Sequence, residues 1–213
     1  MENPGKCIYI PDDYFLDPKL FVVPKKYESY LETILIPRGT IKDRTKLLAK
    51  KIIAESQNEP LTFICVLRGA FKFYESLLHF ANRASSSSEI HHSIEFIRAI
   101  SYTNDQQNDL ILEGLENIQI EGKNIVIVED MVDRGKTLAG VSDVIRTKNP
   151  KSLKICVMSY KRNPVNTFIV PDYIGFSLPN KWIVGYNIDY NGHFRDLAHV
   201  AVINDPAKEK FRV

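Results

Sequence analysis

Three acids, a glycine, a lysine and a threonine follow an apolar run in the second half of the chain. Residues 125–137 read Ile-Val-Ile-Val-Glu-Asp-Met-Val-Asp-Arg-Gly-Lys-Thr. The four β-branched residues predict a buried strand, and residues 137–148 have the composition of a helix. A turn into a helix offers a phosphate free backbone N–H groups and the positive end of the helix dipole. Gly135 allows close backbone approach, and Lys136 and Thr137 can add a charge and a hydroxyl.

The adjacent acids Glu129 and Asp130, which we expect to end the strand, suit other ligands. Carboxylates repel phosphate, but they accept hydrogen bonds from ribose hydroxyls and bind Mg²⁺, a hard cation that takes oxygen ligands. The spacing matches neither a Walker loop nor the Gly-x-Gly-x-x-Gly dinucleotide fingerprint. The segment therefore suits a ribose 5-phosphate with Mg²⁺, and the alternative is a surface strand end with accidental charges.

The elements that must position this loop alternate between strand and helix. Apolar and β-branched runs predict further strands at residues 62–67, 93–100, 153–160, 173–178 and 182–189. Helical spacing predicts helices at 40–56 and 71–82, and the end of the chain is expected to be irregular. This order predicts an α/β fold with a mostly parallel sheet covered by helices on both faces. Ligands of such sheets bind outside the carboxyl ends of the strands.

The size, charge and cysteines of the chain limit the number of domains, the kind of partner and the cellular compartment that we expect. The 213 residues fit a single α/β domain, and a net charge of +2 does not indicate nucleic acid or membrane as a partner. No apolar run approaches the roughly 18 residues of a membrane span, and the N-terminus has no signal-peptide pattern. The three cysteines lie far apart, as expected for free thiols in a reducing compartment and not for a zinc site. We therefore expect a cytoplasmic protein.

Two further segments could act on a ligand. In Leu67-Arg68-Gly69, backbone amides and Arg68 could hold a pyrophosphate, or the segment could be an ordinary strand-to-helix turn. The polar stretch 101–109 could be a lid, because a reaction through a cation-like sugar centre must exclude water. An irregular loop without that role is its alternative.

Four residues of the last third of the chain could contact a base or a diphosphate. Lys161 could donate to a purine carbonyl oxygen, although its position alone favours a solvated strand end. Trp182 could stack on a planar base, although a core position is favoured without further information. Asp189 and Arg195 could hold a metal and a diphosphate, or they could pair with each other on the surface.

Residues 125–137 resemble the signature of the phosphoribosyltransferases, enzymes that use 5-phosphoribosyl-1-diphosphate (PRPP). Together with 67–69, 101–102, 157–162 and 182–196, they make the chain similar to the eukaryotic-type hypoxanthine–guanine phosphoribosyltransferases. The resemblance runs from about Ile8 to Val202. It implies the type I phosphoribosyltransferase fold over residues 1–213, with a core at about 37–172. A small hood would be formed by about 1–36 together with 173–213.

The resemblance also implies an activity. In purine salvage, hypoxanthine or guanine reacts with PRPP to give IMP or GMP and pyrophosphate, and the enzyme is a homodimer or homotetramer. Adenine fits less well, because Lys161 can donate to a 6-oxo group whereas an exocyclic amine needs an acceptor. Asp133 would be the general base at purine N7 while N9 attacks the anomeric carbon.

The same resemblance implies roles for the other site residues. The ribose and 5-phosphate of PRPP would bind to Glu129, Asp130, Met131, Val132, Asp133, Arg134, Gly135, Lys136 and Thr137. Pyrophosphate would bind to Arg68, Gly69 and Arg195, with a cis peptide bond between Arg68 and Gly69. The purine would contact Lys161, Lys181, Trp182, Ile183 and Asp189, beneath a lid that contains Ser101 and Tyr102. Two Mg²⁺ ions would be held by Glu129 and Asp130 and by Asp189.

Two positions depart from the usual family pattern. Position 134 is commonly threonine, and Arg134 could strengthen the phosphate site or obstruct it. Position 68 is often lysine, and Arg68 keeps the charge with a different donor geometry. We expect altered turnover and not inactivity, because Asp133 is present. The alternative is a weakly active or non-catalytic PRPP-binding paralogue with a regulatory role.

Overall fold

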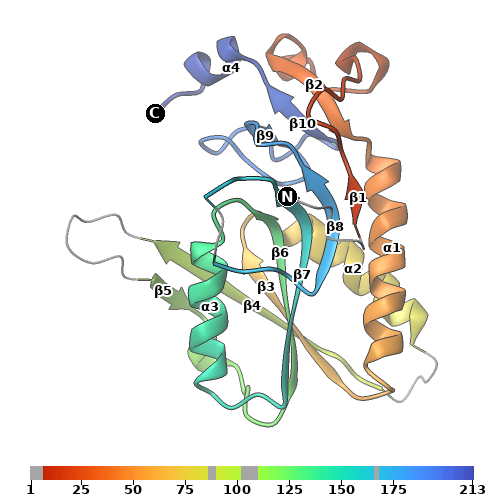
Figure 1. Cartoon of the computed structure of the whole chain (residues 1–213), viewed down its shortest axis with the longest axis vertical. Coiled ribbons are helices and arrows are strands. Elements are labelled where there is room, and N and C mark those ends of the chain that lie inside the picture. The colour runs from red at the N-terminus through yellow and green to blue at the C-terminus, as the bar shows by residue number, and fades with distance from the viewer. Residues whose placement is uncertain (1–6, 86–89, 102–109, 166–167) are drawn as a thin grey trace.

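The larger part of the molecule is a twisted, mostly parallel β-sheet (Figure 1). The structure is a computed structural model that describes residues 7–85, 90–101, 110–165 and 168–213. Within these residues seven strands follow the order β1-β8-β7-β6-β3-β4-β5, and every neighbouring pair is parallel except β4 and β5. The strands are β1 (Ile8–Tyr9), β3 (Leu61–Leu67), β4 (Ser93–Ser101), β5 (Leu110–Glu113), β6 (Asn124–Val132), β7 (Ser152–Lys161) and β8 (Tyr173–Leu178). The predicted α/β class is confirmed.

Helices cover both faces of this sheet, with α1 (Arg38–Glu55) and α2 (Phe71–Ala84) on one face and α3 (Lys136–Arg146) on the other (Figure 1). Successive residues of β3 point to opposite faces, as the period of a strand requires. Phe63 and Cys65 belong to the core beneath α1 and α2, whereas Ile64 and Val66 belong to the core beneath α3. A strand buried on both faces explains the unbroken apolar runs of the sequence.

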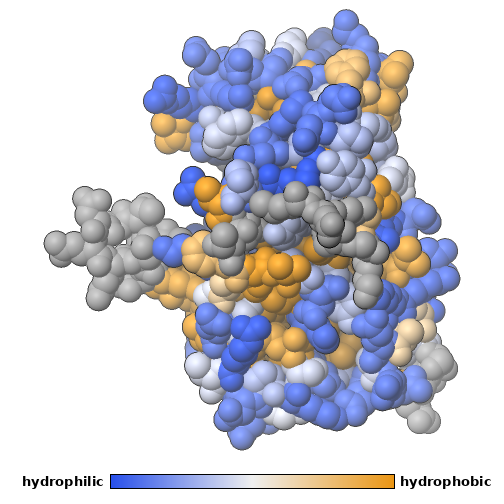
Figure 2. Space-filling model, in the orientation of Figure 1, coloured by the Kyte–Doolittle hydropathy of each residue, from blue (hydrophilic) through white to orange (hydrophobic). Residues whose placement is uncertain are grey.

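A small lobe, which we call the hood, joins residues from both ends of the chain. Its sheet has the order β2-β10-β9, with β2 (Leu31–Ile36), β9 (Ile183–Val184) and β10 (Val200–Ile203) all antiparallel. The short helix α4 (Asp205–Lys210) follows β10, and Tyr27 stacks on Phe194 at 4.2 Å between ring centroids. β8 points toward the hood in Figure 1. Hydrophilic residues dominate the hood surface on the face shown in Figure 2, and its buried core includes Tyr27, Ile34 and Phe194.

Three expectations about element bounds were wrong. β6 does not end with the two acids, because Met131 and Val132 still pair with β7. The strand expected at 182–189 is reduced to Ile183–Val184, because the three residues that follow have positive φ angles. The C-terminus is not irregular, since it forms β10 and α4. The side chain of Asn204 accepts a hydrogen bond from the backbone N–H of Ala207 and so caps α4.

The expected bounds of the hood also differ from the strand pairing. Segment 173–178 forms β8 and pairs with β7, and segment 8–9 forms β1 and pairs with β8. Both therefore belong to the large sheet. Among the described residues, no helix combines the length and apolar character that a membrane crossing requires.

Candidate active site

The candidate residues gather where β3, β6 and β7 end. These three strands are neighbours and parallel, so their carboxyl ends meet at one edge of the sheet. Arg68 follows β3, Asp133 follows β6, and Lys161 is the last residue of β7. The fold thus brings together three of the predicted segments that are far apart in the sequence.

Glu129 and Asp130 are half-buried carboxylates held by backbone N–H groups. The backbone N–H of Asp130 donates to Glu129 Oε1 at 3.1 Å, and that of Met131 donates to Asp130 Oδ1 at 2.6 Å. Neither acid takes part in an ion pair with a lysine, arginine or histidine of the described residues. Burial, and then the charge of Asp130, raise the pKa of Glu129 well above its usual range. The pair is suited to a cation or to hydroxyl donors.

Burial also raises the pKa of Asp130, although several interactions oppose the rise. A hydrogen bond with Glu129, the backbone N–H of Met131 and the charge of Arg195 all favour the ionised form. Because the pKa of Asp130 is still raised, the positive charge near the two acids does not offset the cost of burying them. A ligand that supplied such charge would relieve this imbalance.

The turn after β3 packs directly against Asp130. A Cβ atom built on Gly69 would lie only 1.7 Å from Asp130 Oδ2, so a side chain at position 69 would displace this carboxylate. Asn187 Nδ2 donates to the backbone oxygens of Arg68 and, at 3.1 Å, of Gly69. The turn is therefore held between an acid of β6 and the segment that follows β9.

The cis peptide bond lies between Leu67 and Arg68, so the expected position between Arg68 and Gly69 was wrong by one residue. It falls at the very end of β3, where Leu67 still pairs with Arg98 of β4. The side chain of Arg68 is exposed.

Asp133 lies between two donors from β7 and the loop that follows it. Asn163 Nδ2 donates to Asp133 Oδ1 at 2.6 Å, and Lys161 Nζ lies 3.4 Å from Asp133 Oδ2. Lys161 is 9% exposed, so the solvated strand end that its position alone favoured is wrong. Asn163 was missed in the sequence, because nothing in its neighbourhood of the chain indicates a partner 30 residues away.

The loop 133–137 leads into α3 through a left-handed glycine. Gly135 has a φ angle of +81° and stands at the N-terminal end of α3, where the helix dipole favours an anion. Arg134, Lys136 and Thr137 are exposed there. Among the remaining predicted loop residues, Val132 is buried in the core and Met131 is half-buried, so their side chains are directed elsewhere.

On the hood side, Trp182 is 56% exposed, so the core position favoured from sequence alone is wrong. Its ring meets the ring of Tyr190 edge to face at 5.5 Å between centroids. Ile183 is buried in β9, and Lys181 Nζ pairs with Glu32 at 3.0 Å. One face of a single exposed tryptophan thus remains a candidate surface for a planar base.

Asp189 and Arg195 pair with each other, which was one of the two alternatives left open by the sequence. Arg195 Nη2 lies 2.6 Å from Asp189 Oδ1, and Arg195 Nη1 donates to the backbone oxygen of Asn187 at 2.7 Å. The second oxygen of Asp189 accepts from the backbone N–H of Gly192 at 2.7 Å. This places Arg195 beside the residue that holds the Arg68–Gly69 turn.

The expected lid and the expected metal sites stay predictions. Tyr102 and residues 103–109 lie outside the described residues, and Ser101 is described only as the backbone end of β4. In the described part of the chain, no group of three or more His, Cys, Asp or Glu side chains could hold a metal ion. The carboxylates of Glu129 and Asp130 still fit Mg²⁺, which is commonly bound by one or two carboxylates together with substrate oxygens and water.

Comparison with known proteins identifies the family. A model of the phosphoribosyl transferase domain matches residues 37–191. Hypoxanthine-guanine phosphoribosyltransferase of Homo sapiens is 39% identical over 217 residues, which cover 99% of this chain and 98% of that protein. The Sus scrofa enzyme is 39% identical over 219 residues, with 100% of both chains covered. The crystal structure of the Schistosoma mansoni enzyme in complex with IMP matches with a TM-score of 0.81 and 30% identity, covering 97% of this chain and 100% of that one. The chain belongs to the phosphoribosyltransferase family, among the hypoxanthine-guanine phosphoribosyltransferases.

Proposed function

We propose that this protein transfers the 5-phosphoribosyl group of PRPP to N9 of hypoxanthine or guanine, giving IMP or GMP and pyrophosphate. The observation that carries the proposal is the Asp133 carboxylate, held by Asn163 at 2.6 Å and by Lys161 at 3.4 Å beside the loop that opens α3. A base for the purine and a site for the 5-phosphate thus adjoin each other. The activity of the named relatives agrees with this assignment.

In the proposed reaction the N9 lone pair forms a bond with the anomeric carbon while the bond from that carbon to the diphosphate oxygen breaks. Asp133 accepts the proton that leaves N7, and its carboxylate is already oriented by Asn163 before the purine arrives. An ammonium group has three donors, and within the described residues Lys161 Nζ donates a hydrogen bond only to Asp133. A further donor of Lys161 is then available for the 6-oxo group.

The remaining residues would position PRPP. Glu129 and Asp130 would accept hydrogen bonds from the ribose hydroxyls and hold Mg²⁺, which when bound would stabilise charge on the departing diphosphate. The turn at Gly135 would bind the 5-phosphate at the start of α3. The backbone of Arg68 and Gly69 and the guanidinium of Arg195 would face the diphosphate, which requires Arg195 to share its donors between Asp189 and the ligand.

Three finer assignments are also part of the proposal. Trp182 and the backbone of Ile183 would contact the purine, and residues 101–109 would close over the site. Asp189 would hold a second Mg²⁺ through water. We further propose a homodimer or homotetramer in the cytoplasm, in keeping with the free thiols of Cys7, Cys65 and Cys156.

The test is a turnover assay with PRPP and Mg²⁺, followed by ultraviolet absorbance separately for guanine, hypoxanthine, xanthine and adenine. We expect turnover of guanine and hypoxanthine. In Asp133→Asn we expect it to fall by about 10²–10⁴-fold, because a general base contributes that much. Asp143→Asn is the matched control, since Asp143 is an exposed acid of α3 that pairs with Arg146 at 3.0 Å. Absence of turnover with every base, in a protein that still binds PRPP, would favour the non-catalytic paralogue.

A further inference from the structure

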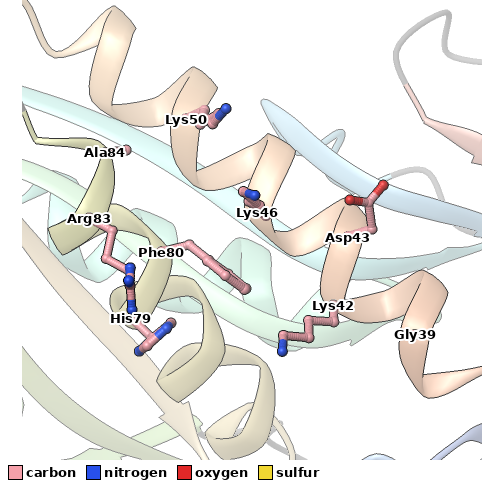
Figure 3. A pocket seen from close by; sticks show the side chains of 9 residues that line it. All are labelled: Gly39, Lys42, Asp43, Lys46, Lys50, His79, Phe80, Arg83 and Ala84. Carbon is pink, nitrogen blue, oxygen red and sulfur yellow. The ribbon is translucent and has the colours of Figure 1, made fainter.

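A groove with a volume of about 590 Å³ lies between α1 and α2, away from the candidate active site. Its walls are Gly39, Lys42, Asp43, Lys46, Lys50, His79, Phe80, Arg83 and Ala84 (Figure 3). None of these residues belongs to the proposed PRPP or purine site. The volume lies within the range of small-molecule sites in proteins.

Positive charge dominates the groove. Lys42, Lys46 and Lys50 recur every fourth residue of α1 and therefore form one ridge. Arg83 faces them from α2, and Asp43 is the one acid of the lining, with its side chain directed away from α2 in Figure 3. Across the described residues, none of these four cations enters an ion pair. A ligand carrying several negative charges would offset their mutual repulsion.

Two other cations of α1, Arg44 and Lys51, contact the rest of the protein. Arg44 donates to the backbone oxygens of Gly175 at 3.1 Å and Ile174 at 2.9 Å and so ties α1 to β8. Lys51 pairs with Glu55 at 3.7 Å. Arg44 and Lys51 are thus engaged with the protein, whereas Lys42, Lys46 and Lys50 enter no ion pair among the described residues. Like charges four residues apart on a helix destabilise it.

The floor of the groove is aromatic. Phe80 is half-buried, packs against the core beneath α1 and α2, and extends from α2 into the space between the helices (Figure 3). The ring of His79 meets it edge to face at 5.1 Å between centroids. The distance from Lys42 to Lys50 is about 12 Å at 1.5 Å per helical residue. A chain of phosphates could lie along this ridge, with a planar ring against Phe80.

We propose that this groove binds an oligophosphate, separately from PRPP and purine. The shared chemistry is a chain of about three phosphates across Lys42, Lys46, Lys50 and Arg83. Two kinds of ligand contain such a chain, a nucleoside triphosphate and a free inorganic oligophosphate. The aromatic floor favours the nucleotide, because Phe80 can contact its base.

The groove is also connected to the candidate active site. A second hollow of about 510 Å³ shares Lys42, His79 and Phe80 with it and extends to Lys72. Lys72 Nζ donates to the backbone oxygen of Arg195 at 3.2 Å. An oligophosphate in the groove would therefore act on the segment that carries Arg195, and it would change the Michaelis constant for PRPP without entering the PRPP site.

The experiment is calorimetric titration of the full chain with inorganic tripolyphosphate and with ATP, without Mg²⁺ and at two salt concentrations. Lys46→Ala/Lys50→Ala is expected to weaken binding about tenfold and to reduce its salt dependence, because two exposed charge contacts are lost. Lys51→Ala is the matched control and is expected to stay within twofold, since it removes the same charge from another face of α1. Turnover of the double variant without oligophosphate should equal that of the wild type.

The two sources are separated by Phe80→Leu. If the wild type binds ATP more tightly than tripolyphosphate and Phe80→Leu loses this difference, the groove is a nucleotide site. If the wild type binds both equally, it is an oligophosphate site. The proposal is overturned if the double variant binds as well as the wild type, or if PRPP displaces all bound tripolyphosphate. A changed sedimentation mass of Lys46→Ala/Lys50→Ala would instead make the groove a subunit interface and would also overturn it.

Discussion

Two groups of acids, the pair Glu129–Asp130 within β6 and the single acid Asp133 just after it, have different electrostatic surroundings. The pair is half-buried, and its acids are held mainly by each other and by backbone N–H groups. Asp133 has a lysine on one oxygen and an amide donor on the other. The pair can therefore accept a cation or hydroxyl donors from a ligand, whereas both oxygens of Asp133 already have donors within the protein. Residues 129–133 thus hold acids in two settings, one held by backbone N–H groups and one held by Lys161 and Asn163.

The course of β6 explains the difference. Glu129 pairs with Val157 of β7, so the acidic pair lies within the sheet, and Asp130 abuts Gly69 of the neighbouring turn. Asp133 comes after the last paired residue, Val132, and reaches the end of β7, where Lys161 and Asn163 lie. A strand that ended earlier would have placed all three acids in the same solvated loop.

Apart from Asp133→Asn, the largest expected effect comes from neutralising the pair with Glu129→Gln/Asp130→Asn. We expect the Michaelis constant for PRPP to rise about 10–100-fold, because two hydrogen bonds to charged groups are lost. The Michaelis constant for guanine should stay the same, since the change leaves Asp133 and Trp182 in place. Steady-state kinetics at varied PRPP and Mg²⁺ measure this effect. Glu116→Gln, at an exposed position, is the control. An unchanged PRPP constant would mean that the pair has no part in PRPP binding.

A smaller effect is expected for Asn163→Ala, which removes one of the two donors to Asp133. We expect the turnover number to fall about tenfold, because the carboxylate of Asp133 loses one of the groups that orient it. A tenfold loss corresponds to a rise of about 1.4 kcal/mol in the activation barrier. Asn163 is a positioning residue, so the Michaelis constant for PRPP should not change. Asn117→Ala removes an exposed asparagine elsewhere and should have no effect. A fall in turnover that came with a matching rise in the PRPP constant would indicate a general loss of structure.

The pH dependence of stability should also reflect the burial of the pair Glu129–Asp130. Burial and the charge of Asp130 raise the pKa of Glu129 above its value in the unfolded chain, so the folded protein binds this proton more tightly. The resulting stabilisation is fully present below the unfolded pKa and is lost as the pH rises through the folded pKa. Glu129→Gln avoids this loss, so its melting temperature should exceed that of the wild type by an amount that grows with pH.

Thermal melts without Mg²⁺ and PRPP, from mildly acidic to neutral pH, test this expectation. Glu121→Gln changes an exposed glutamate and should follow the wild type at every pH. Parallel curves for Glu129→Gln and the wild type would contradict the assigned burial of the pair. Added Mg²⁺ should narrow the difference, because the cation compensates the charge that the variant lacks.

The parts of the site that could be predicted from sequence are those that depend on neighbouring residues. Gly135 and the start of α3 follow from local composition, since a strand, a turn and a helix succeed one another within 125–148. The contact between Asn163 and Asp133 joins residues 30 apart, and it exists only because β6 and β7 are neighbours in register. The abutment of Gly69 on Asp130 likewise depends on the pairing of β3 with β6.

The same reasoning explains the errors about the fold. β10 and α4 were missed because each is short, and β10 is stabilised by pairing with β2, which lies more than 160 residues earlier in the chain. The exposure of Trp182 was missed because an apolar neighbourhood in sequence does not say which of its side chains are covered. Trp182 lies just before β9, whose residues Ile183 and Val184 are buried.

The smallest expected effect is that of Arg134→Thr, which restores the residue common at this position in the family. The sequence left open whether Arg134 strengthens the phosphate site or obstructs it. The side chain is exposed, so it has room to move aside and need not fill the turn. Its charge, however, stays close to the N-terminal end of α3, where it attracts a phosphate through solvent. We therefore expect the Michaelis constant for PRPP to rise about two- to fivefold in Arg134→Thr, because an exposed charge contributes little.

The salt dependence of the Michaelis constant for PRPP tests whether Arg134 acts through its charge. A charge that acts through solvent is screened, so the difference between Arg134→Thr and the wild type should shrink as salt is added. Arg146→Thr is the matched control, because Arg146 is an exposed arginine of α3 whose partner is Asp143. A lower PRPP constant in Arg134→Thr would show that the guanidinium obstructs the turn. Asp133 would then keep its role as the base, since its donors Lys161 and Asn163 come from another part of the chain and do not depend on residue 134.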